Sequence, residues 1–281
     1  MPNDPSRYRY RRYNQNKPLD EEEADIGDEN PVIDAPLTSS SGLSVGSWLL
    51  IFAIIDNSTD IIIRPLPNGL PKTVIPSHYE LFIDATHVEQ NVFTGIVDID
   101  LQINEMINEI ILNSVDLNIT KTEYQQKKTN SYLLDGSVEY DKVYEQVTIK
   151  FIQPINAGNG RLHMEFIGVI NDQPQGFYRT KYKSQICAFT QFEPANARRA
   201  FPCFDEPSLK AKFTICIRAP KHLTTLSNMP IKSQQNDTDQ ACIHEFDTTP
   251  IIATYSVAYV IGAHDFVAIY AANNELIYRH D

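Results

Sequence analysis

The sequence predicts an all-β fold, either an antiparallel β-sandwich or a curved, saddle-like sheet, over residues 64–281. Apolar and polar residues alternate along residues 92–103 and 146–151, which is the period of a half-buried strand. Residues 162–170 and 254–266 are rich in β-branched and aromatic side chains, which strands favour. No long stretch shows the 3.6-residue period of an amphipathic helix.

The alternation divides each predicted strand into an apolar and a polar face. The apolar face of 92–103 consists of Val97, Ile99, Leu101 and Ile103. The same pattern appears in 212–219 with Phe213, Ile215, Ile217 and Ala219. Turn-forming residues separate the runs at Asp135-Gly136, at 156–160 and at Asn273-Asn274. No internal repeat is present, and we interpret 64–281 as one β-domain.

Composition excludes one class of function. The chain has 281 residues with 42% hydrophobic side chains, which is enough for a packed core. Its formal net charge is −12, and a nucleic-acid-binding protein needs clustered Lys and Arg instead. No two of the four cysteines form a C-x-x-C pair, so a zinc knuckle is not expected. Disulfides and buried free thiols both remain open for these cysteines.

Residues 1–41 are predicted to be a disordered polar tail. A basic, tyrosine-rich run comes first, an acidic run follows, and a patch rich in Ser and Thr ends the tail. Few apolar side chains are present to offset the entropy that ordering this segment would cost.

Residues 42–63 are a short apolar segment that admits two interpretations. Its core, 42–55, is shorter than the ~20 apolar residues of a membrane-spanning helix. Basic residues precede 42–55, and none follows this core before Arg64. That polarity is typical of a membrane anchor with a cytoplasmic N-terminus, which would place the β-domain in the lumen or outside the cell. If 42–55 is instead a buried apolar segment, we expect a cytoplasmic protein.

Three N-x-[ST] triplets are candidate glycosylation sites. They begin at Asn57, Asn118 and Asn236. Such triplets also occur by chance, and glycosylation would require the chain to enter the secretory pathway.

The stretch 190–207, TQFEPANARRAFPCFDEP, has an unusual composition for a strand connection. Gln191 and Glu193 are two residues apart, so in extended backbone they point the same way. Pro194 then ends the extended run, and the next residues, 195–200, can form a single helical turn.

Four charged residues of this stretch are assigned to structure. Arg198 and Arg199 are expected to pair with Asp205 and Glu206 and so to hold the loop. From the residues alone, these would be surface ion pairs that stabilise the loop by only ~0–1 kcal/mol each.

The stretch resembles the signature of the N-terminal domain of aminopeptidase N-type zinc metallo-aminopeptidases, the gluzincin aminopeptidases. The shared segments are T-Q-F-E-P, A-R-R-A-F-P-C-F-D-E-P and K-A-K-F. Further similarities along the chain, which extend over residues 65–270, are Leu70-Pro71, Tyr79-Glu80-Leu81, Phe93-Thr94-Gly95, Gly176-Phe177-Tyr178, Ser227-Asn228-Met229-Pro230 and Thr254-Tyr255.

The resemblance implies a substrate-binding role for Gln191 and Glu193. In that family, the residue at Glu193 binds the free α-ammonium group of a peptide, and the residue at Gln191 supports it. A carboxylate suits this task, since a charge-assisted hydrogen bond contributes ~1.5–3 kcal/mol. The implied partners are peptide N-termini and a catalytic domain. A non-catalytic β-domain that binds peptides or another protein is the alternative.

The family's catalytic motifs, G-x-M-E-N and H-E-x-x-H, do not occur in the sequence. We therefore predict no catalytic residue, no metal ligand and no cofactor in this chain, with zinc held only by full-length family members. His244-Glu245 begins like H-E-x-x-H, but Thr248 stands at the fifth position and the stretch is predicted to be a strand. The expectation is a truncated product, an incomplete gene model or an isolated first domain.

Overall fold

The computed structural model shows two compact units of the chain. The described residues are 9–12, 69–127, 134–182, 185–263, 267–270 and 276–279. The predicted tail 1–41, apart from 9–12, and the apolar segment 42–63 lie outside them. In the smaller unit, β1 (Arg9–Arg12), β16 (Val267–Tyr270) and β17 (Leu276–Arg279) form an antiparallel sheet in the order β1-β16-β17.

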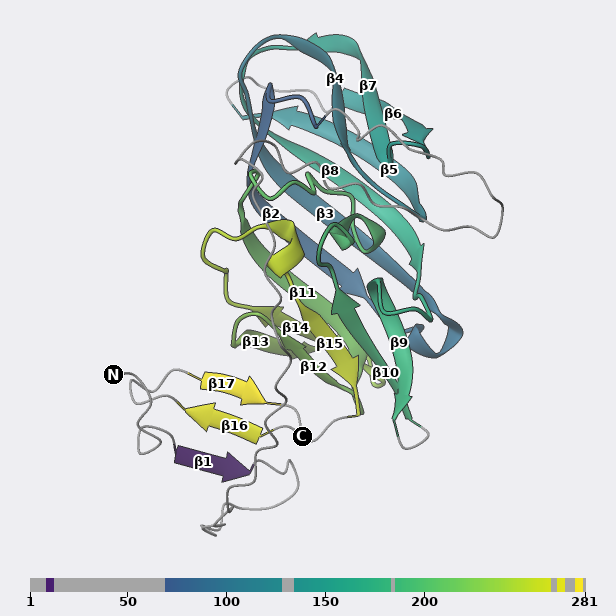
Figure 1. The fold of residues 1–281 in the computed structure, drawn as a ribbon, viewed down its shortest axis with the longest axis vertical. Coiled ribbons are helices and arrows are strands. Elements are labelled where there is room, and N and C mark those ends of the chain that lie inside the picture. Colours follow the sequence, from purple (N-terminus) through teal and green to yellow (C-terminus); the bar gives the residue numbers. More distant parts are fainter. Residues whose placement is uncertain are drawn as a thin grey trace, which may run out of the picture. The chain divides into compact units, whose positions relative to one another are not determined.

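The larger unit is built on a ten-stranded sheet, coloured from blue to green along the chain in Figure 1. Its order is β13-β14-β11-β2-β3-β8-β5-β6-β7-β4. The strands are β2 (Val74–Asp84), β3 (Val92–Ile103), β4 (Ile107–Asn113), β5 (Leu117–Gln126), β6 (Leu134–Asp141), β7 (Gln146–Ile155), β8 (Gly158–Val169), β11 (Lys212–Pro220), β13 (Ile231–Asn236) and β14 (Ala241–Phe246).

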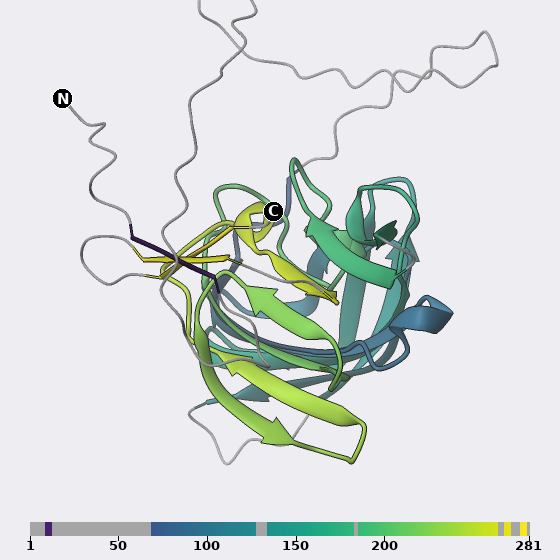
Figure 2. The same ribbon diagram turned by 90° about the horizontal axis from the view of Figure 1, so that it is seen from below.

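A second sheet of four strands has the order β12-β15-β10-β9. Its strands are β9 (Gly176–Tyr182), β10 (Gln185–Gln191), β12 (Thr224–Ser227) and β15 (Tyr259–Gly262). It lies against one face of the curved ten-stranded sheet, as the view in Figure 2 shows. The described residues contain no α-helix, only the 3-10 turns η2 (Val88–Gln90), η3 (Ala197–Arg199) and η4 (Thr254–Ser256). The all-β prediction is therefore confirmed.

One pairing differs from the predicted antiparallel arrangement. Strands β11 and β2 run parallel, with Lys212 opposite His78 and Arg218 opposite Asp84. A parallel pair needs a long connection between its strands, and here β3 to β10 lie between them in the sequence. The turns that punctuate the sequence indicate neighbours joined by short loops, so they give no signal for this pair.

Aromatic side chains join the two sheets. Phe177 of β9 lies 5.1 Å from Phe93 of β3 and 5.1 Å from Tyr259 of β15, measured between ring centroids. Phe192 contacts Tyr259 at 6.1 Å and Phe201 at 5.9 Å in edge-on geometry. All five rings are almost fully buried. Because Phe192 follows β10 directly, this core fixes the backbone on which the candidate site stands.

Within the large sheet, glycines allow aromatic rings to lie flat on a neighbouring strand. A Cβ atom at Gly95 would lie 2.3 Å from the ring of Phe166, its partner across β3 and β8. A Cβ at Gly168 would lie equally close to Phe93. This packing gives Phe93-Thr94-Gly95 a structural reason, since neither ring has room beside a larger residue.

The structure shows free thiols, not disulfides, at most of the cysteines. Cys203, Cys216 and Cys242 are free thiols, and Cys187 is buried. Burial raises the pKa of Cys203 well above its ordinary value and raises that of Cys216 to about 11. These two thiols are therefore protonated near neutral pH and unreactive.

Candidate functional site

The predicted substrate-binding residues lie at the end of β10. Gln191 is the last residue of that strand and pairs with Gly176 at the start of β9. Gln191 and Glu193 are exposed, while Phe192 between them is buried at 2% exposure. This exposed–buried–exposed order agrees with the prediction that Gln191 and Glu193 point the same way.

After Glu193 the chain turns through a cis peptide bond to Pro194 and enters η3. This 3-10 helix confirms the helical turn predicted over 195–200. Asn196 closes the turn, because its backbone N–H donates to the Phe192 carbonyl at 2.7 Å. The side-chain amide of Asn196 also donates to the Glu193 carbonyl at 3.2 Å. The backbone of the candidate anchor is thus held on its C-terminal side.

The ion pair between Arg198 and Asp205 is buried, which corrects the prediction of a surface pair. Arg198 Nε donates to Asp205 at 3.0 Å, and the side chains are 10% and 2% exposed. Asp205 also accepts a 2.6 Å hydrogen bond from the hydroxyl of Thr254. Its backbone N–H donates to the side chain of Asn113 at 3.1 Å. Such a pair belongs to the core and is strongly destabilising to break.

The partners of Arg199 and Glu206 also differ from the prediction. Arg199 does not pair with Asp205 or Glu206, but with Asp116 at 2.6 Å and Glu145 at 3.7 Å. Glu206 accepts a hydrogen bond from the backbone N–H of Leu70. Asp116 and Glu145 have φ angles of 57° and 55°, uncommon for residues other than glycine. Sequence reasoning missed both, because they lie far from Arg199 in the chain and no local pattern marks them.

Tyr79 supports the same loop from within the core. Its hydroxyl oxygen accepts a hydrogen bond from the Phe204 N–H at 3.1 Å, and its ring stacks on Phe213 at 4.6 Å. Burial, with smaller contributions from Cys203 and Asp205, raises the pKa of Tyr79 well above its ordinary value. Tyr79 therefore stays neutral and can remain buried beneath the loop without a counter-ion.

Comparison with known protein families identifies the family to which this β-domain belongs. Residues 75–256 match the Peptidase M1 N-terminal domain, which is more than half of the chain. The chain belongs to the M1 peptidase family. The family resemblance of the sequence is thereby confirmed, and the M1 match includes both Gln191 and Glu193.

The relatives are M1 aminopeptidases of much greater length. Aminopeptidase 2 of Candida albicans is 35% identical over 212 residues, which cover 74% of this chain and 22% of that protein. Aminopeptidase M1 of Arabidopsis thaliana is 36% identical over 204 residues, covering 70% and 23%. The mitochondrial Aminopeptidase 2 of Saccharomyces cerevisiae is 36% identical over 218 residues, covering 74% and 22%. The chain thus spans less than a quarter of the length of these relatives.

M1 peptidases use zinc, which proteins bind through clustered His, Cys, Asp and Glu side chains. Among the described residues, no three His, Cys, Asp or Glu side chains are grouped so as to hold a metal ion. His244-Glu245 lies on strand β14, as predicted, and its two side chains face opposite ways. His244 is 8% exposed, with Cys242 Sγ 3.8 Å from its Nε2, whereas Glu245 bonds to Lys232 on the surface.

The buried His244 should make the stability of this M1 domain depend on pH. Burial lowers the pKa of His244 from its ordinary value of 6.5. Between the folded and unfolded pKa values the unfolded chain binds more protons, so the free energy of unfolding should fall as pH drops below about 6.5. In urea unfolding between about pH 7 and pH 5, His244→Phe should show a smaller fall than the native chain.

The exposed His222 provides the control for that measurement. An equal reduction of the pH dependence in His222→Phe and His244→Phe would refute the assignment to His244. Asp84 and Asp100, whose pKa values are lowered, contribute stability that is lost only at more acidic pH. Burial raises both pKa values, but hydrogen bonds from Thr86 and then Arg218 to Asp84, and from Arg161 and then Lys127 to Asp100, outweigh that effect.

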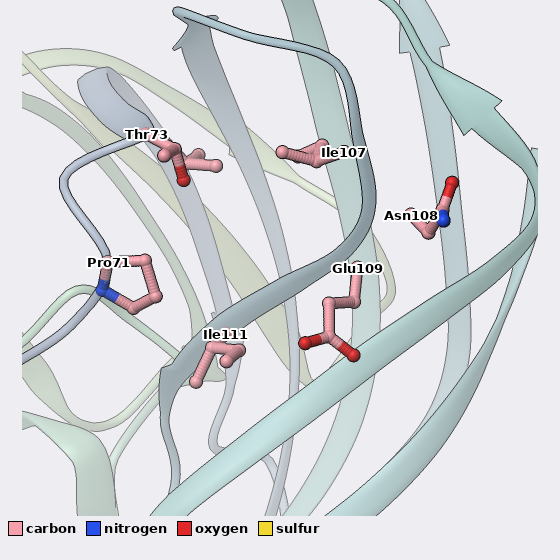
Figure 3. Close-up of a pocket in the computed structure, with 7 residues that line it drawn as sticks. Pro71, Thr73, Ile107, Asn108, Glu109 and Ile111 are labelled. Atoms are coloured by element: carbon pink, nitrogen blue, oxygen red, sulfur yellow. The ribbon is translucent and has the colours of Figure 1, made fainter.

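The M1 domain also has a groove that does not include the predicted substrate-binding residues. It has a volume of about 360 Å³ and opens between the segment that precedes β2 and the edge strand β4 (Figure 3). Its lining residues are Pro71, Thr73, Val74, Ile107, Asn108, Glu109 and Ile111. Neither Gln191 nor Glu193 lines it, so it is not part of the candidate site.

Two of the three candidate glycosylation sites can be located. Asn118 on β5 and Asn236 at the end of β13 are exposed, while Asn57 lies outside the described residues. Within the part of the chain that the structure describes, no helix has the length and apolar character needed to cross a membrane.

Proposed function

We propose that this chain is the substrate-anchoring N-terminal domain of a zinc aminopeptidase that removes N-terminal residues from peptides. In this proposal Glu193 binds the free α-ammonium group of the substrate, and Gln191 supports it. The observation that carries the proposal is that both residues are exposed on either side of the buried Phe192. Polar side chains held on such a fixed backbone suit the recognition of one small charged group.

The chemistry of the anchor explains a preference for chain ends. Interior peptide bonds have no α-ammonium group, so a carboxylate at Glu193 favours peptides with a free N-terminus. Its distance from the reacting centre would then determine how many residues are removed. In the proposal, zinc and the residues that activate water belong to a catalytic domain outside this chain.

The location of the domain is a further part of the proposal. With 42–55 as a membrane anchor, the β-domain lies in the lumen or outside the cell, where Asn118 and Asn236 can carry glycans. The exposure of those two side chains supports this arrangement. A loss of mass on glycosidase treatment of the protein from its natural source would support it, and a purely cytosolic pool would exclude it.

Binding of a small peptide to the 281-residue chain tests the anchor directly. The probe is Ala-Ala-Phe amide, which carries no charge other than its α-ammonium group, titrated into isotope-labelled protein and followed by NMR. We expect saturable shifts of backbone signals at 191–196, no such shifts with the N-acetylated peptide, and their loss in Glu193→Gln.

The matched control replaces a carboxylate that has no role in the proposal. Asp172, which pairs with Arg179 and is 72% exposed, serves for this purpose as Asp172→Asn. The control should bind the peptide like the native chain. Equal shifts with the acetylated peptide, or unchanged binding in Glu193→Gln, would exclude Glu193 as the anchor.

A further inference from the structure

Asn196 uses both ends of its side-chain amide next to the candidate anchor. Its Nδ2 donates to the Glu193 carbonyl at 3.2 Å, and its Oδ1 accepts from Arg199 Nε at 3.3 Å. Its backbone N–H, in addition, donates to the Phe192 carbonyl at 2.7 Å. One residue therefore holds the carbonyl groups of the two peptide bonds on either side of the Glu193 Cα atom.

The orientation of this amide follows from the chemistry of Arg199. A guanidinium group only donates hydrogen bonds, so the oxygen of Asn196 must face Arg199 and the NH₂ group must face Glu193. Arg199 is itself fixed, because Asp116 lies 2.6 Å and Glu145 3.7 Å from its terminal nitrogens. Its side chain is 25% exposed, whereas those of Asp116 and Glu145 are 77% and 40% exposed, so these two ion pairs lie at the surface.

Arg199 also touches the strand that pairs with Gln191. Gly176, opposite Gln191, has a φ of +69°, and a Cβ atom there would lie 2.6 Å from Cβ of Arg199. Glycine is thus needed at this position both for its backbone conformation and for the close approach of Arg199. Arg199 therefore lies against both Asn196, which binds the Glu193 carbonyl, and Gly176, which pairs with Gln191.

We infer that Asn196, oriented by Arg199, is a positioning residue for substrate binding that sets where the Glu193 carboxylate meets the α-ammonium group. This inference rests on the proposed function of Glu193. The side chain of Glu193 is exposed and protrudes from the turn, so its location depends on the backbone that Asn196 holds. A small displacement of a charged group weakens a short charge-assisted hydrogen bond strongly.

The test compares Asn196→Ala with the native 281-residue chain, using the same free and acetylated Ala-Ala-Phe amide peptides. We expect Asn196→Ala to bind the free peptide roughly 2- to 12-fold more weakly, which corresponds to the loss of one hydrogen bond. The acetylated peptide should give no saturable binding in either protein. The acetylated peptide shows that the signal reports the free amine, and a control of similar stability separates a loss of positioning from a loss of folding.

Asn104 provides a matched control because its side chain makes the same kinds of bond far from β10 in the sequence. It accepts from Gln102 at 3.2 Å and donates to the Lys72 carbonyl at 3.4 Å. Asn104→Ala should lower the urea midpoint about as much as Asn196→Ala but leave peptide binding unchanged. Equal weakening in both variants would overturn the inference.

A second variant keeps the test decisive if Asn196→Ala does not fold. Arg199→Lys retains the positive charge near Asp116 but lacks the guanidinium fork that reaches Asn196 at the same time. It should weaken binding of the free peptide in the same direction. Native binding in Arg199→Lys, with binding lost in Glu193→Gln, would overturn the inference and leave the proposed function standing. Native binding in Glu193→Gln would reject the proposed function itself.

Discussion

Replacing Asp205 with alanine should lower the free energy of unfolding of the M1 domain by about 3–5 kcal/mol, the usual effect of removing one partner of a buried ion pair. The change would remove the 3.0 Å partner of the Arg198 guanidinium, whose side chain is 10% exposed, and leave it only Glu145 at 3.1 Å, which is 40% exposed. Thr254 would also lose the acceptor of its 2.6 Å hydrogen bond. Urea unfolding of the 281-residue chain measures the effect.

An exposed ion pair provides the comparison for Asp205. Asp172 pairs with Arg179 at 2.9 Å but is 72% exposed, so Asp172→Ala should change the free energy of unfolding by only about 0–1 kcal/mol. If Asp205→Ala had no larger effect than Asp172→Ala, the Arg198–Asp205 pair would be an ordinary surface contact. The signature A-R-R-A-F-P-C-F-D-E-P would then need another structural explanation.

The strands could be predicted because their pattern is local. Alternation along 92–103 identifies both the strand and its buried face, and the structure buries Val97, Ile99 and Leu101 as expected. The parallel pairing of β11 with β2 could not be predicted in this way. It depends on which distant strand lies beside β11 in space, and the alternation is the same for a parallel or an antiparallel neighbour.

In the candidate site, too, local features could be predicted from the sequence and contacts between distant segments could not. The exposure of Gln191 and Glu193 follows from residue spacing at the end of a strand, which is local information. The contacts that hold the site come from distant segments of the chain, such as Asn113 and Thr254 around Asp205. Charge alone suggested surface pairs for Arg198 and Asp205, because a sequence does not show which charged side chains the fold will bury.

The other large effect expected concerns catalysis in a full-length M1 aminopeptidase that carries this domain. There, Glu193→Ala should lower kcat/KM for peptides with a free N-terminus by about 10- to 150-fold, the equivalent of one charge-assisted hydrogen bond. KM should rise, because the contact to the α-ammonium group already exists in the bound substrate. A fall in kcat in addition would indicate that the contact strengthens as the reaction proceeds.

The choice of substitutions at position 193 can separate charge from hydrogen bonding. Glu193→Gln keeps a hydrogen-bond acceptor without the negative charge, so it should retain part of the activity that Glu193→Ala loses. Glu139, an exposed carboxylate on β6 paired with Lys150, provides the control, and Glu139→Ala should leave both kinetic constants unchanged. Native kcat/KM in Glu193→Ala would show that the enzyme recognises the α-ammonium group without this residue. The domain would then serve to support the catalytic part rather than to bind the substrate.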